Sequence, residues 1–210
     1  MLFDIRNVSF RYPGGPMVLK DINLQIEEGE RIGLLGPSGF GKSTLMQLMA
    51  GYLKPTEGEI LYKGKPLPEK GYNPVQLIWQ HPEQAVNPRW KMQKILKEAW
   101  IPDSDILKKF GIEEEWLSRW PIELSGGELQ RFCIVRALGP KTEFLIADEM
   151  STMLDVITQA QIWNAVTDEV IKRNLGMIAV THNPVLAQKV CTRCIELSEI
   201  NKVKVELKEI

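Results

Sequence analysis

The sequence predicts an α/β protein built on a parallel β-sheet, and three observations support this class. Short apolar segments of strand length recur along the chain, and helical segments separate them. A long helical stretch, roughly 156–174, lies between the strand-like segments 144–148 and 177–181, which is the spacing of parallel strands joined by a crossover helix. A glycine-rich loop at 36–43 also joins a buried strand to a helix.

The first part of the chain predicts a small antiparallel β region. Alternating apolar and polar residues, typical of half-buried strands, occupy 2–10 and 22–26, and a further short strand is expected at 58–62. Turn-forming residues bound them, because Pro13-Gly14-Gly15-Pro16 separates the first two segments and Gly64 closes the third. We assign about 1–30 and 56–72 to this region.

The rest of the chain predicts a sheet core into which a helical subdomain is inserted. Residues 31–35 have the continuous apolar pattern of a buried strand, and a helix is expected at 43–50, ended by Gly51. Helices with breaks are expected in the middle of the chain, and the breaks lie at Pro102, Gly111 and Pro121. We therefore expect a single domain, 1–210. The helical subdomain covers about 81–139, and the core consists of about 31–55, 73–80 and 140–210.

Composition and charge argue against several classes of protein. The chain of 210 residues is 44% hydrophobic and 25% charged, as globular proteins are, and its formal net charge is −1. The lack of a basic surplus argues against a nucleic-acid partner, although it leaves a local basic patch open. No apolar run approaches the ~18 residues of a membrane-spanning helix, and the N-terminus lacks the apolar core of a signal peptide. We therefore expect a soluble, cytoplasmic protein.

The three cysteines, Cys133, Cys191 and Cys194, are expected to be reduced thiols. Their odd number, without a signal peptide, argues against a disulfide framework. Cys191 and Cys194 have the spacing of a zinc-binding pair, but no second pair accompanies them, and we place them near a late strand.

The glycine-rich loop has the G-x-x-x-x-G-K-S pattern of a phosphate-binding loop. It reads Gly36-Pro37-Ser38-Gly39-Phe40-Gly41-Lys42-Ser43, and Thr44 follows as a further nucleotide-binding candidate. Glycines let main-chain N–H groups turn inward around phosphate oxygens, Lys42 reaches the outer phosphates, and the Ser43 hydroxyl can ligate Mg²⁺. A random chain of this length matches the pattern only about 1% of the time. The loop therefore predicts nucleotide binding.

Polar residues follow the predicted parallel strands, and their chemistry suits phosphoryl transfer. The strand before the loop leads to Lys42, and the other three strands are followed by Gln80, by Asp148 with Glu149, and by His182. Ligands of open parallel sheets bind outside the carboxyl ends of the strands, so these side chains should converge on one phosphate. Each alone would be an ordinary strand end, but four such ends together with the loop favour a site.

These residues have separate candidate roles. Asp148 would support Mg²⁺, and a bound cation also explains two adjacent carboxylates at a buried strand end. Glu149 could act as the general base that polarises the attacking water. His182 could hydrogen-bond the terminal phosphate, and it could equally belong to the start of a helix before Asn183. We take four residues as the catalytic set: Lys42, Gln80, Glu149 and His182.

A second candidate anion-binding surface lies far along the chain, at Leu124-Ser125-Gly126-Gly127-Glu128, or LSGGE. Ser125 and Glu128 have the spacing of a capping box, so this segment could simply begin a helix. A cap alone gives no reason for two glycines in the first turn, where glycine lowers helix stability. Glycines there would let a phosphate approach the helix N-terminus. Two such motifs in one chain suggest that two copies share nucleotides.

Over essentially its whole length, the chain resembles the ATPase domain of ABC transporters. The ordered motifs are Tyr12, the phosphate-binding loop, Gln80, LSGGELQR at 124–131, the strand with its acids, 151–155 and His182. The resemblance implies a P-loop NTPase core that hydrolyses ATP with Mg²⁺. It also implies two domains packed head to tail, in which the loop of one copy and Ser125–Glu128 of the other enclose each ATP.

The same resemblance assigns roles to further residues. Tyr12 would stack on adenine, and Asp155 would lie in a loop that crosses the dimer interface. Gln80 would contact Mg²⁺ and connect the core to the helical subdomain. The expected magnesium ligands are Ser43, Gln80 and Asp148.

Two segments resemble the ATPases of peptide and nickel importers in particular. Gln80-His81-Pro82 with Asn87-Pro88-Arg89 is similar to Q-D-P…L-N-P-R, and 154–162 is similar to L-D-V-x-x-Q-A-Q-I. The chain departs from that group at His81, where Asp is usual, and at Met150, where proline usually follows the catalytic Glu. It also ends soon after Cys194, without the C-terminal extension common there, and the effect on regulation stays open.

The resemblance implies a subunit that energises a separate membrane permease, with uptake of a peptide or nickel-type substrate as the expected function. Expected partners are ATP, a second ABC ATPase subunit, polytopic permease subunits and, for an importer, an extracytoplasmic binding protein, with no nucleic acid. The subunit would lie in the cytoplasm, peripheral on the inner face of the cell membrane.

Two alternatives remain at this point. One is a soluble ABC-type ATPase that acts in DNA repair or translation, against which the lack of a coiled-coil insertion and of a second ATPase domain argues. The other is a non-hydrolysing regulatory binder, against which Glu149 and His182 argue. The sequence leaves open the substrate, the direction of transport, the permease, and whether the dimer pairs identical subunits.

Overall fold

A computed structural model describes residues 1–203, and the first strands of the chain form an antiparallel sheet. The strands are β1 (Phe3–Arg11), β2 (Met17–Ile26) and β4 (Glu57–Tyr62), in the order β2-β1-β4. The second strand begins at Met17 and not at the predicted residue 22. Asp21 adopts a left-handed conformation with a φ of 50°, and the ladder is shifted there, so the alternation of buried side chains is broken.

The central sheet consists of five parallel strands, which confirms the predicted α/β class. They are β3 (Arg31–Leu35), β5 (Val75–Ile78), β6 (Phe144–Asp148), β7 (Gly176–Val180) and β8 (Arg193–Glu196), in the order β5-β6-β7-β3-β8. The four strands that lead to the predicted site residues are therefore direct neighbours. The last strand contains Cys194, and all three cysteines are free thiols, as predicted.

Helices pack on both faces of the central sheet. They are α1 (Lys42–Met49), α4 (Gly126–Ala137), α5 (Val156–Lys172), α6 (Pro184–Val190) and α7 (Leu197–Ile200). The predicted helices at 43–50 and 156–174 correspond to α1 and α5. The helix α6, with Asn183 as its N-cap, begins where a helix start was the alternative interpretation of His182. The sequence did not predict α7, because four residues are too few to show a helical period. Within residues 1–203, no helix is both long and apolar enough to span a bilayer.

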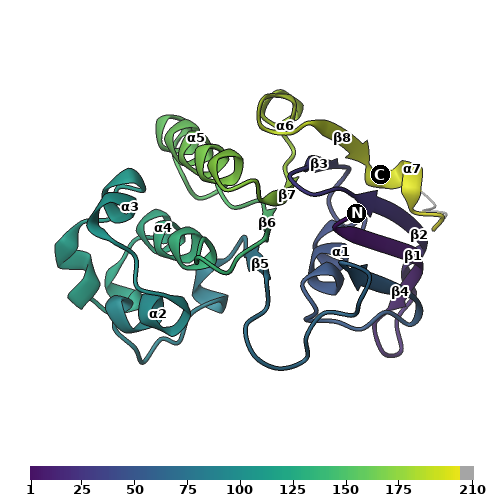
Figure 1. Cartoon of the computed structure of the whole chain (residues 1–210), viewed down its shortest axis with the longest axis horizontal. Coiled ribbons are helices and arrows are strands. Elements are labelled where there is room, and N and C mark those ends of the chain that lie inside the picture. Colours follow the sequence, from purple (N-terminus) through teal and green to yellow (C-terminus); the bar gives the residue numbers. More distant parts are fainter. Residues whose placement is uncertain (204–210) are drawn as a thin grey trace, which may run out of the picture.

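The middle of the chain is helical and is broken where the sequence predicted. The helices α2 (Met92–Ala99) and α3 (Ser104–Lys109) lie on either side of Pro102, and Gly111, with a φ of 62°, follows α3. Three short 3₁₀ turns complete this part: η1 (Pro82–Gln84), η2 (Glu114–Ser118) and η3 (Pro121–Glu123). Figure 1 shows α2 and α3 beside α4 at one end of the molecule and the antiparallel sheet at the other.

The subdomain boundaries given above stay predictions. Of the range 140–210 that we assigned to the core, residues 204–210 lie outside the described part of the chain.

Two hydrophobic clusters fix the central sheet from its two faces. Ile146 of β6 belongs to the cluster formed with the antiparallel sheet and α1, whereas Leu145 and Ala147 belong to the cluster formed with α2, α4 and α5. Phe3 and Phe144 join the two sheets by edge-to-face packing, with ring centroids 4.8 Å apart. Burial on both faces is typical of parallel sheets and holds the carboxyl ends of the strands in one place.

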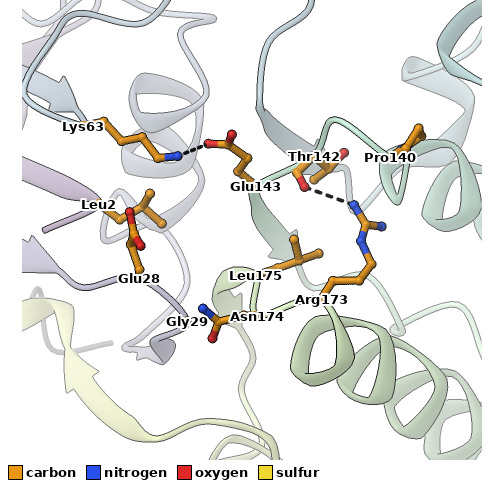
Figure 2. A pocket seen from close by; sticks show the side chains of 10 residues that line it. All are labelled: Leu2, Glu28, Gly29, Lys63, Pro140, Thr142, Glu143, Arg173, Asn174 and Leu175. Atoms are coloured by element: carbon orange, nitrogen blue, oxygen red, sulfur yellow. Dashed lines mark hydrogen bonds and ion pairs between the residues drawn. The ribbon is translucent and has the colours of Figure 1, made fainter.

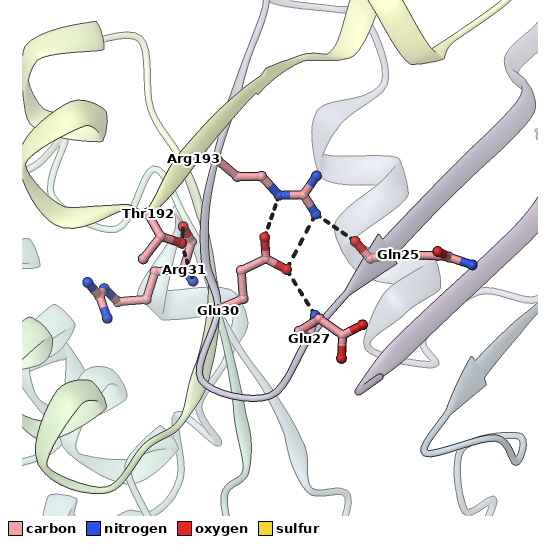
Figure 3. A network of polar contacts seen from close by, with 6 residues as sticks. All are labelled: Gln25, Glu27, Glu30, Arg31, Thr192 and Arg193. Atoms are coloured by element: carbon pink, nitrogen blue, oxygen red, sulfur yellow. Dashed lines mark hydrogen bonds and ion pairs between the residues drawn. The ribbon is translucent and has the colours of Figure 1, made fainter.

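Polar contacts connect the sheets at the amino ends of β3 and β8 (Figure 3). The Arg193 guanidinium donates to Glu30 Oε1 at 2.5 Å and to the carbonyl oxygen of Gln25 at 2.6 Å. The main-chain N–H of Arg31 donates to Thr192 Oγ1 at 3.1 Å, and this hydroxyl donates to the Arg31 carbonyl at 2.8 Å. These contacts attach the edge strand β8 to both its neighbour β3 and the end of β2.

A pocket of about 300 Å³ lies where β6 and β7 begin (Figure 2). In this pocket the Lys63 ammonium lies 2.7 Å from the Glu143 carboxylate, and the Tyr62 hydroxyl donates to the same carboxylate. The hydrogen bond from Lys63 is the main cause that lowers the pKa of Glu143. The described residues that line the pocket include none of the predicted site residues, which lie at the opposite ends of the strands.

Candidate functional site

The phosphate-binding loop connects the end of β3 to the start of α1, which is the predicted strand–loop–helix arrangement. At Gly41 the φ angle is 95°, a conformation that favours glycine. A Cβ at this position would also lie 2.9 Å from Leu19 Cδ2 and 3.1 Å from Val18 Cγ1. The shape of the loop directly before α1 therefore depends on glycine.

Lys42 is the buried cation of the site, with 5% of its surface exposed. Its Nζ donates to the carbonyl oxygens of Gly36 at 2.7 Å and Pro37 at 2.9 Å, so the side chain folds back over the loop. Burial lowers the pKa of Lys42, and the charges of Glu149 and Asp148 act in the opposite direction. The ammonium therefore lies near the two acids, where it can neutralise an anionic ligand of the loop.

Asp148, the last residue of β6, is 6% exposed. Its Oδ1 has no hydrogen-bond partner within residues 1–203. Burial is the main cause that raises the pKa of Asp148, while a hydrogen bond with Ser43 lowers it. Mg²⁺ prefers oxygen ligands, and an unpaired buried carboxylate oxygen beside a hydroxyl provides them. The side chains of Ser43 and Asp148 therefore fit the predicted magnesium ion.

Glu149 connects residues that follow three neighbouring strands. Its Oε2 accepts a hydrogen bond from Gln80 Nε2 at 3.0 Å, and its Oε1 lies 2.6 Å from His182 Nε2. Its main-chain N–H donates to the Val180 carbonyl at 3.1 Å. The φ angle of Glu149 is 47°, a strained conformation for glutamate that occurs preferentially at functional sites. The structure thus brings together Gln80, Glu149 and His182.

Tyr12 lies beside the start of α1. Its hydroxyl is 3.3 Å from Thr44 Oγ1, and its ring packs edge to face on Phe10 with centroids 4.9 Å apart. The residue is 43% exposed, so part of the ring is accessible next to the phosphate-binding loop. This position suits stacking on a nucleotide base, and the role itself stays a prediction.

Ser125 caps α4 in the predicted capping box. Its Oγ accepts from the Glu128 N–H at 3.3 Å, and Glu128 Oε2 accepts from the Ser125 N–H at 2.7 Å. In the described part of the chain, no hydrogen bond joins Ser125 to the phosphate-binding loop. Figure 1 shows α4 and α1 on different sides of β5 and β6. Within one copy, the two candidate anion-binding motifs therefore remain apart.

Packing within the chain also explains the two glycines at the start of α4, and the sequence did not predict this packing. A Cβ on Gly126 would lie 3.1 Å from Met153 Sδ, and one on Gly127 would lie 2.9 Å from Leu154 Cδ2. The expectation that only an approaching phosphate explains these glycines was therefore incomplete. Residues 153 and 154 are far from 126 and 127 in the sequence, so no local pattern indicated this packing.

Asp155 is the N-cap of α5. Its side chain accepts hydrogen bonds from the main-chain N–H groups of Ile157 at 3.1 Å and Thr158 at 3.0 Å. Hydrogen bonding from Thr158 is the main cause that lowers the pKa of Asp155. The structure thus gives Asp155 a capping role within the chain, and its place in a dimer interface stays a prediction.

Two buried residues of α4, to which the sequence motifs gave no separate role, contact the chain segment around Gln80. Gln130 Nε2 donates to the Trp79 carbonyl at 3.1 Å, and Cys133 Sγ donates to the Pro82 carbonyl at 3.8 Å. These two carbonyls lie on either side of Gln80 in the sequence. The sequence signal for Gln130 was its place in LSGGELQR, which gives it no separate role, and Cys133 had none.

The arrangement of these residues is that of P-loop nucleotide-binding proteins, because a strand–loop–helix unit presents a lysine and main-chain N–H groups to one anionic ligand. Comparison with known families defines the class more narrowly. The ABC transporter family matches residues 19–152, and the chain belongs to this family as an ATP-binding domain.

Individual relatives agree with this assignment. The chain is 35% identical to the nickel import system ATP-binding protein NikE of Staphylococcus aureus, over 94% of this chain and 87% of that protein. It is 26% identical to the ATP-binding cassette MJ0796, solved as a dimer in a post-hydrolysis state with ADP and phosphate. The TM-score is 0.79, over 93% of this chain and 94% of that chain.

The cbiO1 protein of Clostridium perfringens, part of the ABC transporter complex cbiONQ, shares the fold. It is 24% identical with a TM-score of 0.75, over 93% of this chain and 84% of that one. Family membership and these neighbours confirm the predicted ATP binding and ATPase activity.

Proposed function

We propose that this ABC transporter ATPase energises a separate permease for the uptake of nickel ions or peptides. The observation that carries the mechanism is the contact of Glu149 with both Gln80 (3.0 Å) and His182 (2.6 Å), next to buried Asp148. The similarity to NikE, whose name assigns it to nickel import, supports the substrate class. The resemblance of 154–162 to the peptide and nickel importer ATPases agrees with this similarity.

In this proposal the nucleotide lies across the loop 36–44. Main-chain N–H groups of the loop and Lys42 bind the phosphates, because the loop's glycines permit close approach and the ammonium is already beside the loop carbonyls. Tyr12 stacks on the base from the side of Thr44. A bound Mg²⁺ would neutralise phosphate charge and would be held by Ser43, Asp148 and Gln80.

Glu149 is the proposed general base. Its carboxylate accepts the proton of the attacking water, a contribution of about 10²- to 10⁴-fold for a positioned base. Gln80 and His182 each contact one of its two oxygens, so the carboxylate has a fixed orientation. His182 is 46% exposed in its side chain, which leaves it access to a terminal phosphate on the open side.

The proposed assembly is a head-to-tail pair of ATPase subunits. Ser125–Glu128 lie away from the loop within one copy, so they need a second copy to contact a nucleotide. The first turn of α4 can accept an anion there, since helix N-termini attract negative charge. Asp155, at the start of the neighbouring helix α5, would lie in the same interface.

We propose that the pair works with polytopic permease subunits from the cytoplasmic face of the membrane, and with an extracytoplasmic binding protein. Affinity purification of the tagged chain from detergent-solubilised membranes tests this assembly. Two polytopic subunits should copurify with it. Copurification with ribosomes or DNA in their place would instead support the alternative of a soluble ABC-type ATPase.

Transport assays test the substrate. Cells that carry the wild-type chain should accumulate labelled nickel or a labelled dipeptide, and cells with Lys42→Ala should lose that uptake while the permease level is unchanged. Equal uptake of both compounds in the two strains would contradict the proposed substrate class.

A further inference from the structure

One face of α4 holds the chain segment that contains Gln80. Gln130 Nε2 donates to the Trp79 carbonyl at 3.1 Å, and Cys133 Sγ donates to the Pro82 carbonyl at 3.8 Å. Residues three apart on a helix lie on the same face, so both donors come from one side of α4. Gln80 therefore lies between two main-chain points that the same helix face fixes.

Both donors are enclosed by the core. Gln130 is 1% exposed and Cys133 is 4% exposed, so water does not compete for the two donor groups. Burial raises the pKa of the Cys133 thiol to about 11. The thiol thus keeps its proton at neutral pH and remains a hydrogen-bond donor.

Stability alone does not explain an amide at position 130. Its Oε1 is buried and has no hydrogen-bond partner within residues 1–203. A buried acceptor without a donor costs free energy, and this cost offsets part of what the N–H bond to the Trp79 carbonyl contributes to stability. What the amide supplies is the N–H group that binds the Trp79 carbonyl.

The held segment leads directly to the carboxylate that we assign as the base. Gln80 Nε2 donates to Glu149 Oε2 at 3.0 Å, and the other oxygen of Glu149 contacts His182 at 2.6 Å. A displacement of the main chain at Trp79 would move its neighbour Gln80 and disturb this contact. Shifts of about 1 Å at groups that orient catalytic residues can lower rates by about a hundredfold.

We propose that Gln130 is a positioning residue for ATP hydrolysis: together with Cys133 it fixes the main chain on both sides of Gln80 and so sets the contact between Gln80 and Glu149. The helix that carries Gln130 begins at Ser125, so this contact also connects the LSGGE segment to the proposed base. The inference rests on the roles proposed above for Gln80 and Glu149.

Steady-state ATPase kinetics of Gln130→Met test the inference. Methionine fills the space and removes the N–H donor together with the unpaired Oε1. We expect kcat to fall on the order of tenfold, KM for ATP to change by less than about twofold, and the thermal midpoint to stay near that of the wild type. The matched control is Thr167→Val in α5, which removes a buried Oγ1 that has no hydrogen-bond partner in the described part of the chain, and it should leave kcat unchanged.

A double-mutant cycle with Gln80→Ala shows whether Gln130 acts through Gln80. Residues that act through one another are not additive, so Gln130→Met should lower kcat little further in the Gln80→Ala background. Cys133→Val should also lower kcat in the wild-type background and lower it little further in the Gln80→Ala background. It replaces Gln130→Met in this test if the Gln130→Met protein does not fold.

The outcomes separate this inference from the proposed function. An unchanged kcat in Gln130→Met, or an equal loss in both backgrounds, would overturn the positioning role. Wild-type kcat in Gln80→Ala alone would instead remove the proposed role of Gln80, on which the inference depends.

Discussion

Lys42 and Asp148 are buried more deeply than any other charged side chain in residues 1–203, at 5% and 6% exposure. Burial lowers the pKa of Lys42 and raises the pKa of Asp148, and Asp148 Oδ1 has no hydrogen-bond partner within residues 1–203. Folding alone does not favour such a pair, because buried charges without full pairing lower stability. A ligand would explain their position, since a phosphate in the loop needs a cation and the proposed Mg²⁺ needs a free carboxylate oxygen.

At the residue scale, Lys42→Ala should abolish ATP binding. The variant removes the buried ammonium beside the loop carbonyls of Gly36 and Pro37. Isothermal titration calorimetry with ATP measures the effect, and Lys65→Ala, at an exposed position, is the control. Unchanged affinity in Lys42→Ala would contradict the assignment of the loop as the phosphate site.

Asp148→Asn should stabilise the protein at neutral and alkaline pH, while it raises the Mg²⁺ concentration that ATP hydrolysis requires. The folded state raises the pKa of Asp148 above its unfolded value, mainly by burial. Between the two pKa values the folded protein binds more protons than the unfolded protein, so the free energy of unfolding falls as pH rises. The ionised Asp148 therefore costs stability above its folded pKa, and asparagine removes this cost.

Thermal unfolding of the wild type and of Asp148→Asn, compared from about pH 8 to about pH 5, tests this sign. The stabilisation by asparagine should shrink as the pH falls, because Asp148 of the wild type then takes up its proton. A difference that grows on acidification would show that pairing with Lys42 and Ser43, and not burial, dominates the pKa of Asp148.

At the element scale, the start of α4 serves the fold of one chain in two ways. Ser125 and Glu128 cap the helix, and Gly126 and Gly127 make room for residues 153–154. Neither feature requires a nucleotide. A test of the proposed contact with a second copy's nucleotide therefore needs a substitution that preserves the cap.

Ser125→Asp is such a substitution. Aspartate also caps helices and suits the helix dipole, so the thermal stability of the monomer should stay within about 1 kcal/mol of the wild type. In a closed dimer the new carboxylate would face a triphosphate, and an unpaired buried charge costs about 3–5 kcal/mol. Dimerisation and hydrolysis should therefore be lost, while ATP binding to the monomer persists.

Analytical ultracentrifugation and ATPase assays of Ser125→Asp measure these effects. Ser125→Ala is the matched comparison, because it removes the cap without adding charge and should cost about 0.5–2 kcal/mol of stability. Normal ATPase activity in a Ser125→Asp protein that still dimerises would rule out the contact with the partner's nucleotide.

How far the sequence predicted each element depends on whether its signal was local. Gln80, Glu149 and His182 could be placed together because apolar strands precede them and parallel strands end at one edge of a sheet. The predicted start of β2 was wrong because Asp21 adopts a left-handed conformation, which breaks the alternation of buried side chains. The contact between Gln130 and the Trp79 carbonyl could not be predicted, since it joins distant segments through a side chain whose helix pattern is otherwise apolar.

At the scale of the whole molecule, one copy of the chain holds the loop and the proposed base at one edge of its sheet, and it holds LSGGE elsewhere (Figure 1). The neighbour MJ0796 was solved as a dimer with the products of ATP hydrolysis. In the proposed head-to-tail pair, two copies, or two related subunits, would bring the loop of one and the LSGGE segment of the other to one nucleotide. ATP should therefore promote assembly, and hydrolysis should reverse it.

The measurement that tests this mechanism most directly is single-turnover ATP hydrolysis by Glu149→Gln, recorded together with light scattering. Glutamine keeps the contacts that bind ATP but cannot accept a proton from water, so hydrolysis should fall by about 10²-fold or more while ATP remains bound. With ATP the variant should accumulate as a dimer, and the wild type without nucleotide should be mostly monomeric. Hydrolysis by Glu149→Gln at the wild-type rate would contradict the assignment of Glu149 as the base.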